Sequence, residues 1–201
     1  MNRMKNGFCA ALTGGIACGK TTVARFWQQW GAAVCDADAV AHELIAPGGD
    51  CVEDVLREFG ESVRNSEGGV DRNRLGAVVF ADVSARERLN ALLHPVVIHQ
   101  MQDWAGRIRR EGRLGVAVVP LLFEAGMGKD WDVVICVASR EEKMLERLAA
   151  RGLSPTEAQA RMASQWPVSQ KKKLADRVIK NDGSLAELET ECRLVWNVLF
   201  E

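Results

Sequence analysis

Short apolar runs alternate along the chain with longer segments in which apolar residues recur at three- and four-residue steps. The first run, 8–12, is suited to a buried strand. The next segment predicts a helix whose apolar face is formed by Val23, Phe26, Trp27 and Trp30. Gly31 stands where the C-terminal cap of that helix is expected. The chain therefore opens with a strand, a polar connection and an amphipathic helix.

The same alternation returns in the second half of the chain. Further apolar runs predict strands at 32–35, 116–119, 132–137 and 177–181. A closing helix is expected with Leu185, Leu188, Cys192, Val195 and Leu199 on one face. Strands that alternate with helices indicate an α/β fold with a parallel five-stranded sheet flanked by helices.

Residues 41–111 interrupt this pattern and are predicted to be mostly helical, leading the chain away from the sheet. Helical faces are expected at Val52, Val55, Leu56 and Phe59, at Leu75, Val78, Val79 and Phe80, and at Leu89, Leu92 and Leu93. Gly60 ends the first of these helices, and a turn at 65–69 precedes the second. His94-Pro95 is expected to break the third, because the residue before a proline avoids the α region. A separate helix is expected over 96–110.

The polar connection after the first strand contains the Walker A pattern, with Gly14, Gly19, Lys20 and Thr21 at the required spacing. Glycines permit positive φ angles, so successive backbone N–H groups can form a nest for phosphate oxygens. Lys20 adds a mobile charge for the β- and γ-phosphates, and the Thr21 hydroxyl can hold Mg²⁺. The helix that starts here also brings its positive dipole end to the anion. This stretch predicts ATP and Mg²⁺ as cofactors.

A lipoprotein signal peptide is the alternative interpretation of the first residues. Arg3 and Lys5 precede an apolar run, as such a segment requires. The run at 8–12 is shorter than the apolar core of about 7–15 residues that signal peptides need. We therefore favour the strand.

Two aspartates follow the second predicted strand, Asp36 and Asp38. Parallel strands end at the ligand face of such sheets, so both carboxylates should emerge beside the phosphate loop. Alternation places them on the same side if strand geometry continues, and a helix N-cap is the structural alternative for Asp38. The third strand ends at Pro120 rather than at a Walker B aspartate. The carboxylate near the metal is therefore Asp36, Asp38 or Glu124.

A basic stripe lies between the fourth and fifth strands, formed by Arg140, Lys143, Arg147 and Arg151. Ser154 and Glu157 make a capping box that starts a second helix, which carries Arg161. Such a helical hairpin can form a lid that neutralises transition-state charge and excludes water. Ordinary solvated helices are the alternative, since neighbouring glutamates can neutralise the stripe. Arg147 is the strongest candidate for a catalytic arginine.

Composition limits the classes of partner. A chain of 201 residues, 47% hydrophobic and with a net charge of −1, fits one domain with an inserted subdomain and argues against nucleic-acid binding. No apolar stretch approaches the ~20 residues of a membrane span, so we expect no membrane association. The six cysteines form no C-x-x-C pair, which favours reduced core thiols in a cytoplasmic protein. Cys18 lies inside the phosphate loop and could be accessible, but an inert thiol is favoured.

Several motifs together resemble those of the dephospho-CoA kinase family, over nearly the whole chain. They are the loop at 12–21, Asp-Ala-Asp at 36–38, Asp71-Arg72, His94-Pro95, Pro-Leu-Leu-Phe-Glu at 120–124, Arg147 with Arg151, and 175–181. The Walker A part is shared by many families, whereas the aspartate, His-Pro and Pro-Leu-Leu-Phe-Glu motifs are more specific. This chain departs from the family at Ala17 and Cys18, where Gly-Ser is usual. Ala17 is expected to avoid strongly glycine-only backbone angles.

The resemblance implies transfer of the ATP γ-phosphoryl group to the ribose 3′-hydroxyl of dephospho-CoA. It implies a P-loop kinase core at about 1–40, 112–139 and 174–201, a helical CoA-side subdomain at about 41–111 and a lid at about 140–173. The catalytic residues would be Asp38 as general base, Lys20 and Arg147. ATP would contact Gly14, Gly15, Ala17, Cys18, Gly19, Lys20, Thr21, Thr22, Arg147 and Asn181. Acceptor contacts would come from Asp38, Arg72, His94, Leu122 and Glu124, and metal ligands from Thr21 and Asp36.

Two other functions remain open from the residues alone. One is another small-molecule or nucleotide kinase on the same core, because the phosphate loop does not identify the acceptor. The other is a nucleotide-binding module without catalysis, against which the paired aspartates and the basic stripe argue. A monomer or weak homo-oligomer is expected.

Overall fold

A computed structural model describes residues 7–200; the Arg3 and Lys5 of the signal-peptide alternative lie outside this range. The strands are β1 (Phe8–Gly14), β2 (Ala33–Asp36), β3 (Leu114–Val118), β4 (Val133–Ala138) and β5 (Arg177–Lys180). The α-helices are α1 (Lys20–Gln29), α2 (Ala37–Leu44), α3 (Val52–Phe59), α4 (Arg72–Ala81), α5 (Val83–Arg110), α6 (Glu141–Ala149), α7 (Pro155–Ala163), α8 (Val168–Leu174) and α9 (Leu185–Phe200). Short 3₁₀ turns are η2 (Glu61–Val63) and η3 (Met127–Lys129). None of the described helices is long and apolar enough to cross a membrane.

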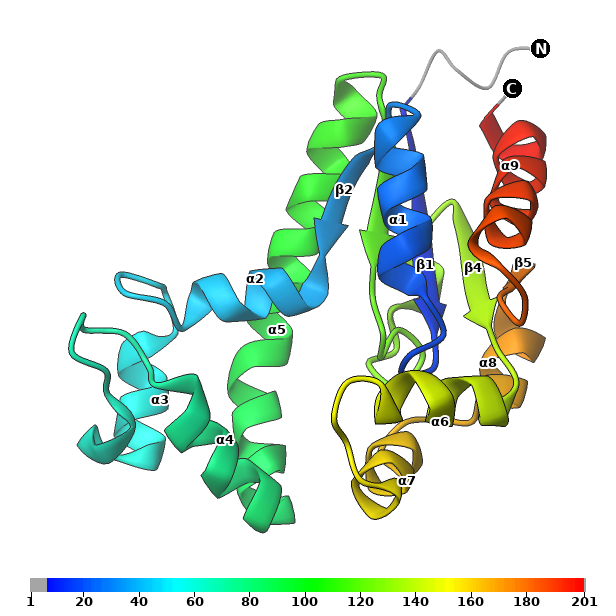
Figure 1. Cartoon of the computed structure of the whole chain (residues 1–201). Coiled ribbons are helices and arrows are strands. Elements are labelled where there is room, and N and C mark those ends of the chain that lie inside the picture. Colours follow the sequence, from blue (N-terminus) through cyan, green and yellow to red (C-terminus); the bar gives the residue numbers. More distant parts are fainter. Residues whose placement is uncertain (1–6, 201) are drawn as a thin grey trace. The chain divides into compact units, whose positions relative to one another are not determined.

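The chain divides into two compact units, one containing 7–36 and 104–200 and the other 37–103. The first unit holds a five-stranded sheet in the order β2-β3-β1-β4-β5, and every pairing is parallel. This confirms the predicted α/β fold. β1 lies at the centre, so the loop that follows it emerges at the middle of the carboxyl edge (Figure 1).

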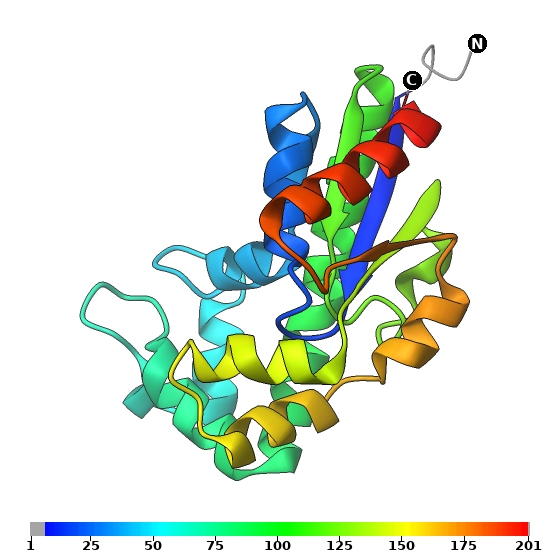
Figure 2. The same ribbon diagram turned by 45° about the vertical axis from the view of Figure 1, so that its right-hand side comes forward.

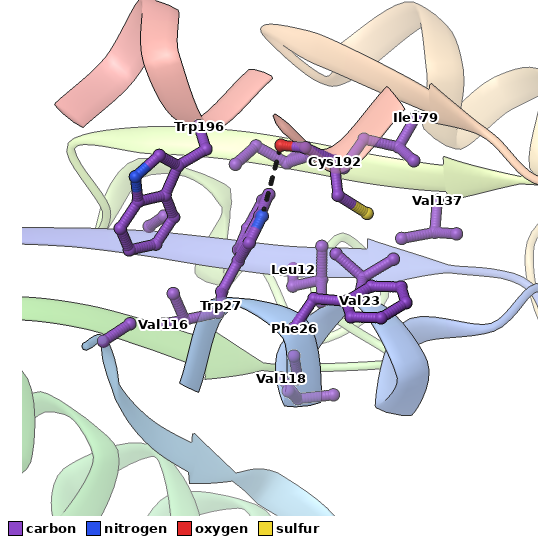
Figure 3. Close-up of a cluster of buried hydrophobic side chains, with 14 of the residues drawn as sticks. Leu12, Val23, Phe26, Trp27, Val116, Val118, Val137, Ile179, Cys192 and Trp196 are labelled. Atoms are coloured by element: carbon purple, nitrogen blue, oxygen red, sulfur yellow. Dashed lines mark hydrogen bonds between the residues drawn. The ribbon is translucent and has the colours of Figure 1, made fainter. Parts of the chain in front are cut away.

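An aromatic cluster packs α1 and α9 against the sheet (Figures 2 and 3). Trp27 is fully buried in it, and its indole N–H donates to the Cys192 carbonyl oxygen at 3.4 Å. Trp196 and Phe200 stack edge to face with centroids 4.8 Å apart. Burial of a large aromatic side chain contributes about 1.5–3 kcal/mol, so this cluster anchors the helix that carries Lys20 and Thr21.

The end of α1 confirms the predicted cap at Gly31, whose φ is +106°. The N–H of Gly31 donates to the Gln28 carbonyl and the N–H of Ala32 donates to the Trp27 carbonyl. These two bonds form a Schellman motif, which requires a left-handed residue at that position. The turn sends the chain directly into β2.

The second unit contains α2, α3, α4 and the first part of α5. The helix predicted to end at Gly60 does so, and the turn at 65–69 is held by the Asn65 side chain, which accepts from Glu67 and Gly69 N–H groups. The apolar face expected for α4 is wrong: Leu75 is buried, but Phe80 is 73% exposed. The predicted helical range was 41–111, whereas this unit spans 37–103.

Two further expectations are corrected in the helices. His94-Pro95 does not break the chain, because α5 runs without interruption from Val83 to Arg110 with Pro95 inside it. The helix predicted over 96–110 is therefore the second half of a longer one. In α9, Leu185 is 57% exposed rather than part of the apolar face, whereas Leu188 and Cys192 are buried as expected.

Candidate active site

The phosphate loop lies between β1, which ends at Gly14, and α1, which begins at Lys20. Gly14 and Gly19 have φ angles of +142° and +98°. A Cβ on Gly14 would collide with the Val137 carbonyl oxygen, and one on Gly19 would collide with the Asn181 amide nitrogen. The ammonium of Lys20 donates to the carbonyl oxygens of Gly14 and Gly15 at 3.0 and 2.9 Å. The sequence therefore folds here into a loop with its lysine held over it.

Ala17 has a φ of +58°, the only positive φ outside glycine among the described residues. This φ lies in the left-handed α region, which favours glycine but is open to residues with a side chain, so it does not contradict the expectation that Ala17 avoids strongly glycine-only angles. Left-handed geometry costs a residue with a side chain roughly 1–2 kcal/mol. The methyl group of Ala17 packs in a small buried cluster with Leu148 and Ala158, which offsets part of that cost.

Cys18 is fully buried, which supports the favoured interpretation of an inert thiol over an accessible one. Its thiol donates to the Met144 sulfur at 3.4 Å. Burial raises the pKa of the Cys18 thiol, although the nearby Lys20 charge acts in the opposite direction. A protonated, enclosed thiol is a space-filling group.

Arg147 ties α6 to the phosphate loop and to the end of β5. Its guanidinium donates to the Ala17 carbonyl at 3.1 Å, the Ser139 hydroxyl at 2.8 Å, and the Asn181 carbonyl and side-chain oxygens at 2.8 and 3.1 Å. The Asn181 amide donates in turn to the Cys18 carbonyl at 2.8 Å. The structure thus brings together Arg147, Asn181 and the loop, three parts of the chain that the family resemblance assigns to the nucleotide.

Ser139 was missed by sequence reasoning, although it directly follows β4 at the carboxyl edge of the sheet. The rest of the predicted basic stripe does not reach the loop. Arg140 faces Asp182 at 3.6 Å and Lys143 pairs with Glu146 at 2.8 Å, while Arg151 lies beyond the end of α6. Surface pairing therefore accounts for two of these charges.

Asp36 and Asp38 lie in different elements. Asp36 is the last residue of β2 and pairs with Val118, which itself pairs with Leu12 of β1. Helix α2 begins at Ala37, so strand geometry does not continue and the condition for placing the two carboxylates on one side by alternation is not met. Asp38 lies in the first turn of α2, where its charge is favourable to the helix dipole.

The acceptor candidates are distributed over both units. In the first, Leu122 is fully buried and Glu124 accepts hydrogen bonds from Lys171 and the Trp166 backbone. In the second, Arg72 is the first residue of α4 and His94 is a half-buried residue of α5. Burial lowers the pKa of His94.

A cavity of about 600 Å³ adjoins the phosphate loop on the side of the predicted lid. Its lining residues come from α6, α7, the start of α8 and the segments beside them. These helices lie at the carboxyl end of the sheet (Figure 1). Its lining includes Gly15, Ile16, Met144, Met162, Trp166 and Val168. Sequence reasoning missed Trp166, which lies in the connection between α7 and α8 and is therefore not part of a helical pattern of apolar residues.

A central parallel strand, a glycine loop with an inserted lysine and a helix that starts at that lysine define a P-loop kinase. Comparison with known proteins identifies the particular kind. The family model described as dephospho-CoA kinase matches residues 8–187. The chain belongs to the dephospho-CoA kinase family, which makes it a transferase that phosphorylates dephospho-CoA to coenzyme A with ATP.

One curated relative and two solved structures illustrate the similarity. A dephospho-CoA kinase of Symbiobacterium thermophilum is 44% identical over 187 residues, which are 92% of this chain and 78% of the relative. A solved structure from Thermus thermophilus is 34% identical, with a TM-score of 0.81, and covers 98% of this chain and 100% of its own. The solved dephospho-CoA kinase of Campylobacter jejuni is 26% identical, with a TM-score of 0.70, over 96% of this chain and 97% of its own.

Proposed function

We propose that this chain transfers the ATP γ-phosphoryl group to the ribose 3′-hydroxyl of dephospho-CoA with Asp38 as general base. A ribose hydroxyl is a poor nucleophile, so a carboxylate within hydrogen-bond reach can take its proton as attack proceeds. The observation that carries the proposal is the phosphate loop in a chain that matches this family over residues 8–187. Most of the acceleration would come from alignment and charge stabilisation, as in other phosphoryl transfers.

The nucleotide would be bound by the loop from Gly14 to Thr22. Backbone N–H groups would donate to the phosphate oxygens, and Lys20 would move from the Gly14 and Gly15 carbonyls to the β- and γ-phosphates. The loop residues assigned to ATP are Gly14, Gly15, Ala17, Cys18, Gly19, Lys20, Thr21 and Thr22. Cys18 would contribute only its backbone, since its side chain is buried.

Arg147 and Asn181 would flank the nucleotide. Arg147 is held by oxygens of the loop and of the β5 end, an arrangement that keeps the guanidinium beside the phosphate-binding backbone. A planar guanidinium can exchange such carbonyl contacts for phosphate oxygens. We propose that Arg147 stabilises the charge that develops on transfer, within a lid over about 140–173.

Thr21 and Asp36 are the proposed holders of Mg²⁺. Their hydroxyl and carboxylate oxygens fit the preference of this ion for hard oxygen donors. No cluster of three or more His, Cys, Asp or Glu among residues 7–200 could hold a metal by itself. This fits an ion held by one or two protein oxygens together with phosphates and water. When bound, the ion would supply positive charge to the β- and γ-phosphate oxygens.

Acceptor contacts are assigned by motif matching to Asp38, Arg72, His94, Leu122 and Glu124. Leu122 is enclosed, so it would act by holding the 120–124 segment rather than by side-chain contact. We propose the helical segment of about 41–111 as the CoA-side subdomain. Free and mostly buried cysteines support a cytoplasmic location, and we expect a monomer or weak homo-oligomer without nucleic-acid or membrane partners.

The test is ADP release from Mg-ATP with dephospho-CoA, beside AMP, CMP and pantetheine as competing acceptors. Strong stimulation by dephospho-CoA alone is expected. Stimulation by another acceptor instead would move the substrate to a sister kinase, and slow turnover unaffected by any acceptor would favour a binding module.

A further inference from the structure

Lys171 of α8 is fully buried, although the neighbouring Lys172 and Lys173 are exposed. An ammonium group in the interior lowers stability unless it is paired and hydrogen-bonded. Replacing such a pair by apolar groups is often neutral or stabilising, so stability alone is a weak reason for a lysine here. Its contacts therefore point to a role in the site.

The Lys171 ammonium joins two points of the segment that follows β3. It donates to the Glu124 carboxylate oxygen Oε1 at 2.7 Å and to the Pro120 carbonyl at 2.7 Å. The same Pro120 carbonyl accepts the hydroxyl of Thr13 at 3.3 Å. Because Thr13 immediately precedes Gly14, one partly buried network links α8, the Pro120–Glu124 segment and the start of the phosphate loop.

Glu124 uses its two carboxylate oxygens differently. Oε1 accepts from both Lys171 and the Trp166 backbone N–H, the latter at 2.9 Å, and Trp166 lines the cavity beside Gly15. Oε2 is buried and has no hydrogen-bond partner. An enclosed carboxylate oxygen without a donor is unfavourable by about 1–3 kcal/mol or more, so a donor supplied by a ligand would remove that penalty.

We propose that Lys171 is a positioning residue for phosphoryl transfer. It holds Glu124 by Oε1 and leaves Oε2 to accept a hydrogen bond from the bound acceptor. It also fixes Trp166, and with it one wall of the cavity, through the shared oxygen. This inference rests on the proposed function, in which Glu124 contacts the acceptor.

The experiment compares Lys171→Met, Glu124→Gln and the double variant in steady-state kinetics with both substrates varied. Lys171→Met should raise KM for dephospho-CoA about tenfold, the loss of roughly one charged hydrogen bond, with KM for ATP within about twofold of the parent. Glu124→Gln should give a similar change. The double variant should be no worse than Glu124→Gln, because without the carboxylate Lys171 has nothing left to orient. Lys173→Met, the same change at an exposed position two residues further along α8, should match the parent.

The outcomes separate the two proposals. An unchanged KM for dephospho-CoA in Glu124→Gln would remove Glu124 from the acceptor site and the inference with it. A second outcome would overturn the inference alone. In it, Glu124→Gln raises KM for dephospho-CoA, whereas Lys171→Met lowers kcat and leaves KM for dephospho-CoA unchanged, as a smaller fraction of active enzyme would. If Lys171→Met does not fold, the double variant still decides. The double variant has no buried carboxylate left without its ammonium partner, so the cause of misfolding is removed. A KM for dephospho-CoA in the double variant well above that of Glu124→Gln would contradict the proposal.

Discussion

Single side chains around the phosphate loop are held by contacts from distant parts of the chain. Asn181, at the end of β5, donates to a loop carbonyl and accepts from Arg147, so its small amide connects three elements. Gly19 leaves the space that this amide occupies. The glycine at that position is therefore required by packing as well as by its φ of +98°.

Ala17 offers a direct test of backbone strain in the loop. Ala17→Gly removes the strain of a positive φ, which stabilises the fold by about 1 kcal/mol, and removes a buried methyl group, which destabilises it by a similar amount. The free energy of unfolding should therefore stay within about 1 kcal/mol of the parent. Ala17→Val places a β-branched residue at the same φ and should lower the free energy of unfolding by about 2–4 kcal/mol. Urea unfolding of both variants measures the difference. Equal stability of the two would mean that the left-handed geometry is not maintained in solution.

The base assignment is tested at Asp38. Asp38→Asn should lower kcat by about 10²–10⁴, the usual range for a general base, while ATP affinity changes little because the phosphate loop is intact. Lys20→Ala serves as the contrasting variant and should abolish transfer. Steady-state kinetics with a separate measurement of ATP binding distinguish the two. Near-normal turnover of Asp38→Asn would exclude Asp38 as the base.

At the scale of elements, α5 differs most from the expectation. Sequence reasoning used the local effect of proline on the preceding residue and placed a break at His94. In the structure α5 continues through Pro95 for 28 residues, because tertiary packing of Leu93, Val97 and Met101 outweighs the lost backbone hydrogen bond. A helix interior proline is a local penalty that a buried face can offset.

Replacing Pro95 should therefore stabilise the protein. Pro95→Ala restores a helical N–H and should raise the free energy of unfolding by about 1–3 kcal/mol. Pro155, at the first position of α7, is the matched control, since a proline there is favourable and Pro155→Ala should give no gain. Urea unfolding curves of both variants provide the comparison. A loss of stability in Pro95→Ala would show that the ring itself makes indispensable contacts.

Elements with a strong periodic pattern could be predicted and irregular ones could not. The run at 8–12 and the face of Val23, Phe26 and Trp27 predict β1 and α1, because both patterns follow from burial against one sheet. Asp38 was predicted as a site residue but its position inside a helix was not, because no turn residue marks the change from strand to helix at Ala37. Lys171 escaped because three consecutive lysines are typical of a solvated helix end, and only the tertiary structure buries one of them.

For the molecule as a whole, the ionisation of buried thiols is expected to lower stability at alkaline pH. Burial raises the pKa of Cys9 and Cys136 to about 11 and that of Cys192 to about 12. In the unfolded chain a cysteine ionises near pH 8.5, so above that pH the unfolded state releases protons that the folded state keeps. The stability contributed by these thiols is full below about pH 8.5 and is lost as the pH rises toward 11–12.

The expected result is a fall in the free energy of unfolding between pH 7.5 and 9.5, of roughly 1 kcal/mol for each such cysteine. The chain has no tyrosine, so phenol ionisation does not contribute in this range. Urea unfolding in the presence of a reductant measures it, and Cys192→Ala should flatten the dependence in part. A pH-independent free energy across this interval would contradict the buried, protonated state of the thiols.

The junction between β2 and α2 contains no connecting residue: the strand ends at Asp36 and the helix begins at Ala37. One inserted residue there would turn Asp38 by about 100° and shift it about 1.5 Å along the helix axis. A surface turn such as 65–69 can absorb the same insertion. Among chains that share this chemistry, changes in length should therefore accumulate in such turns, and the spacing of the two aspartates should be inherited as a unit.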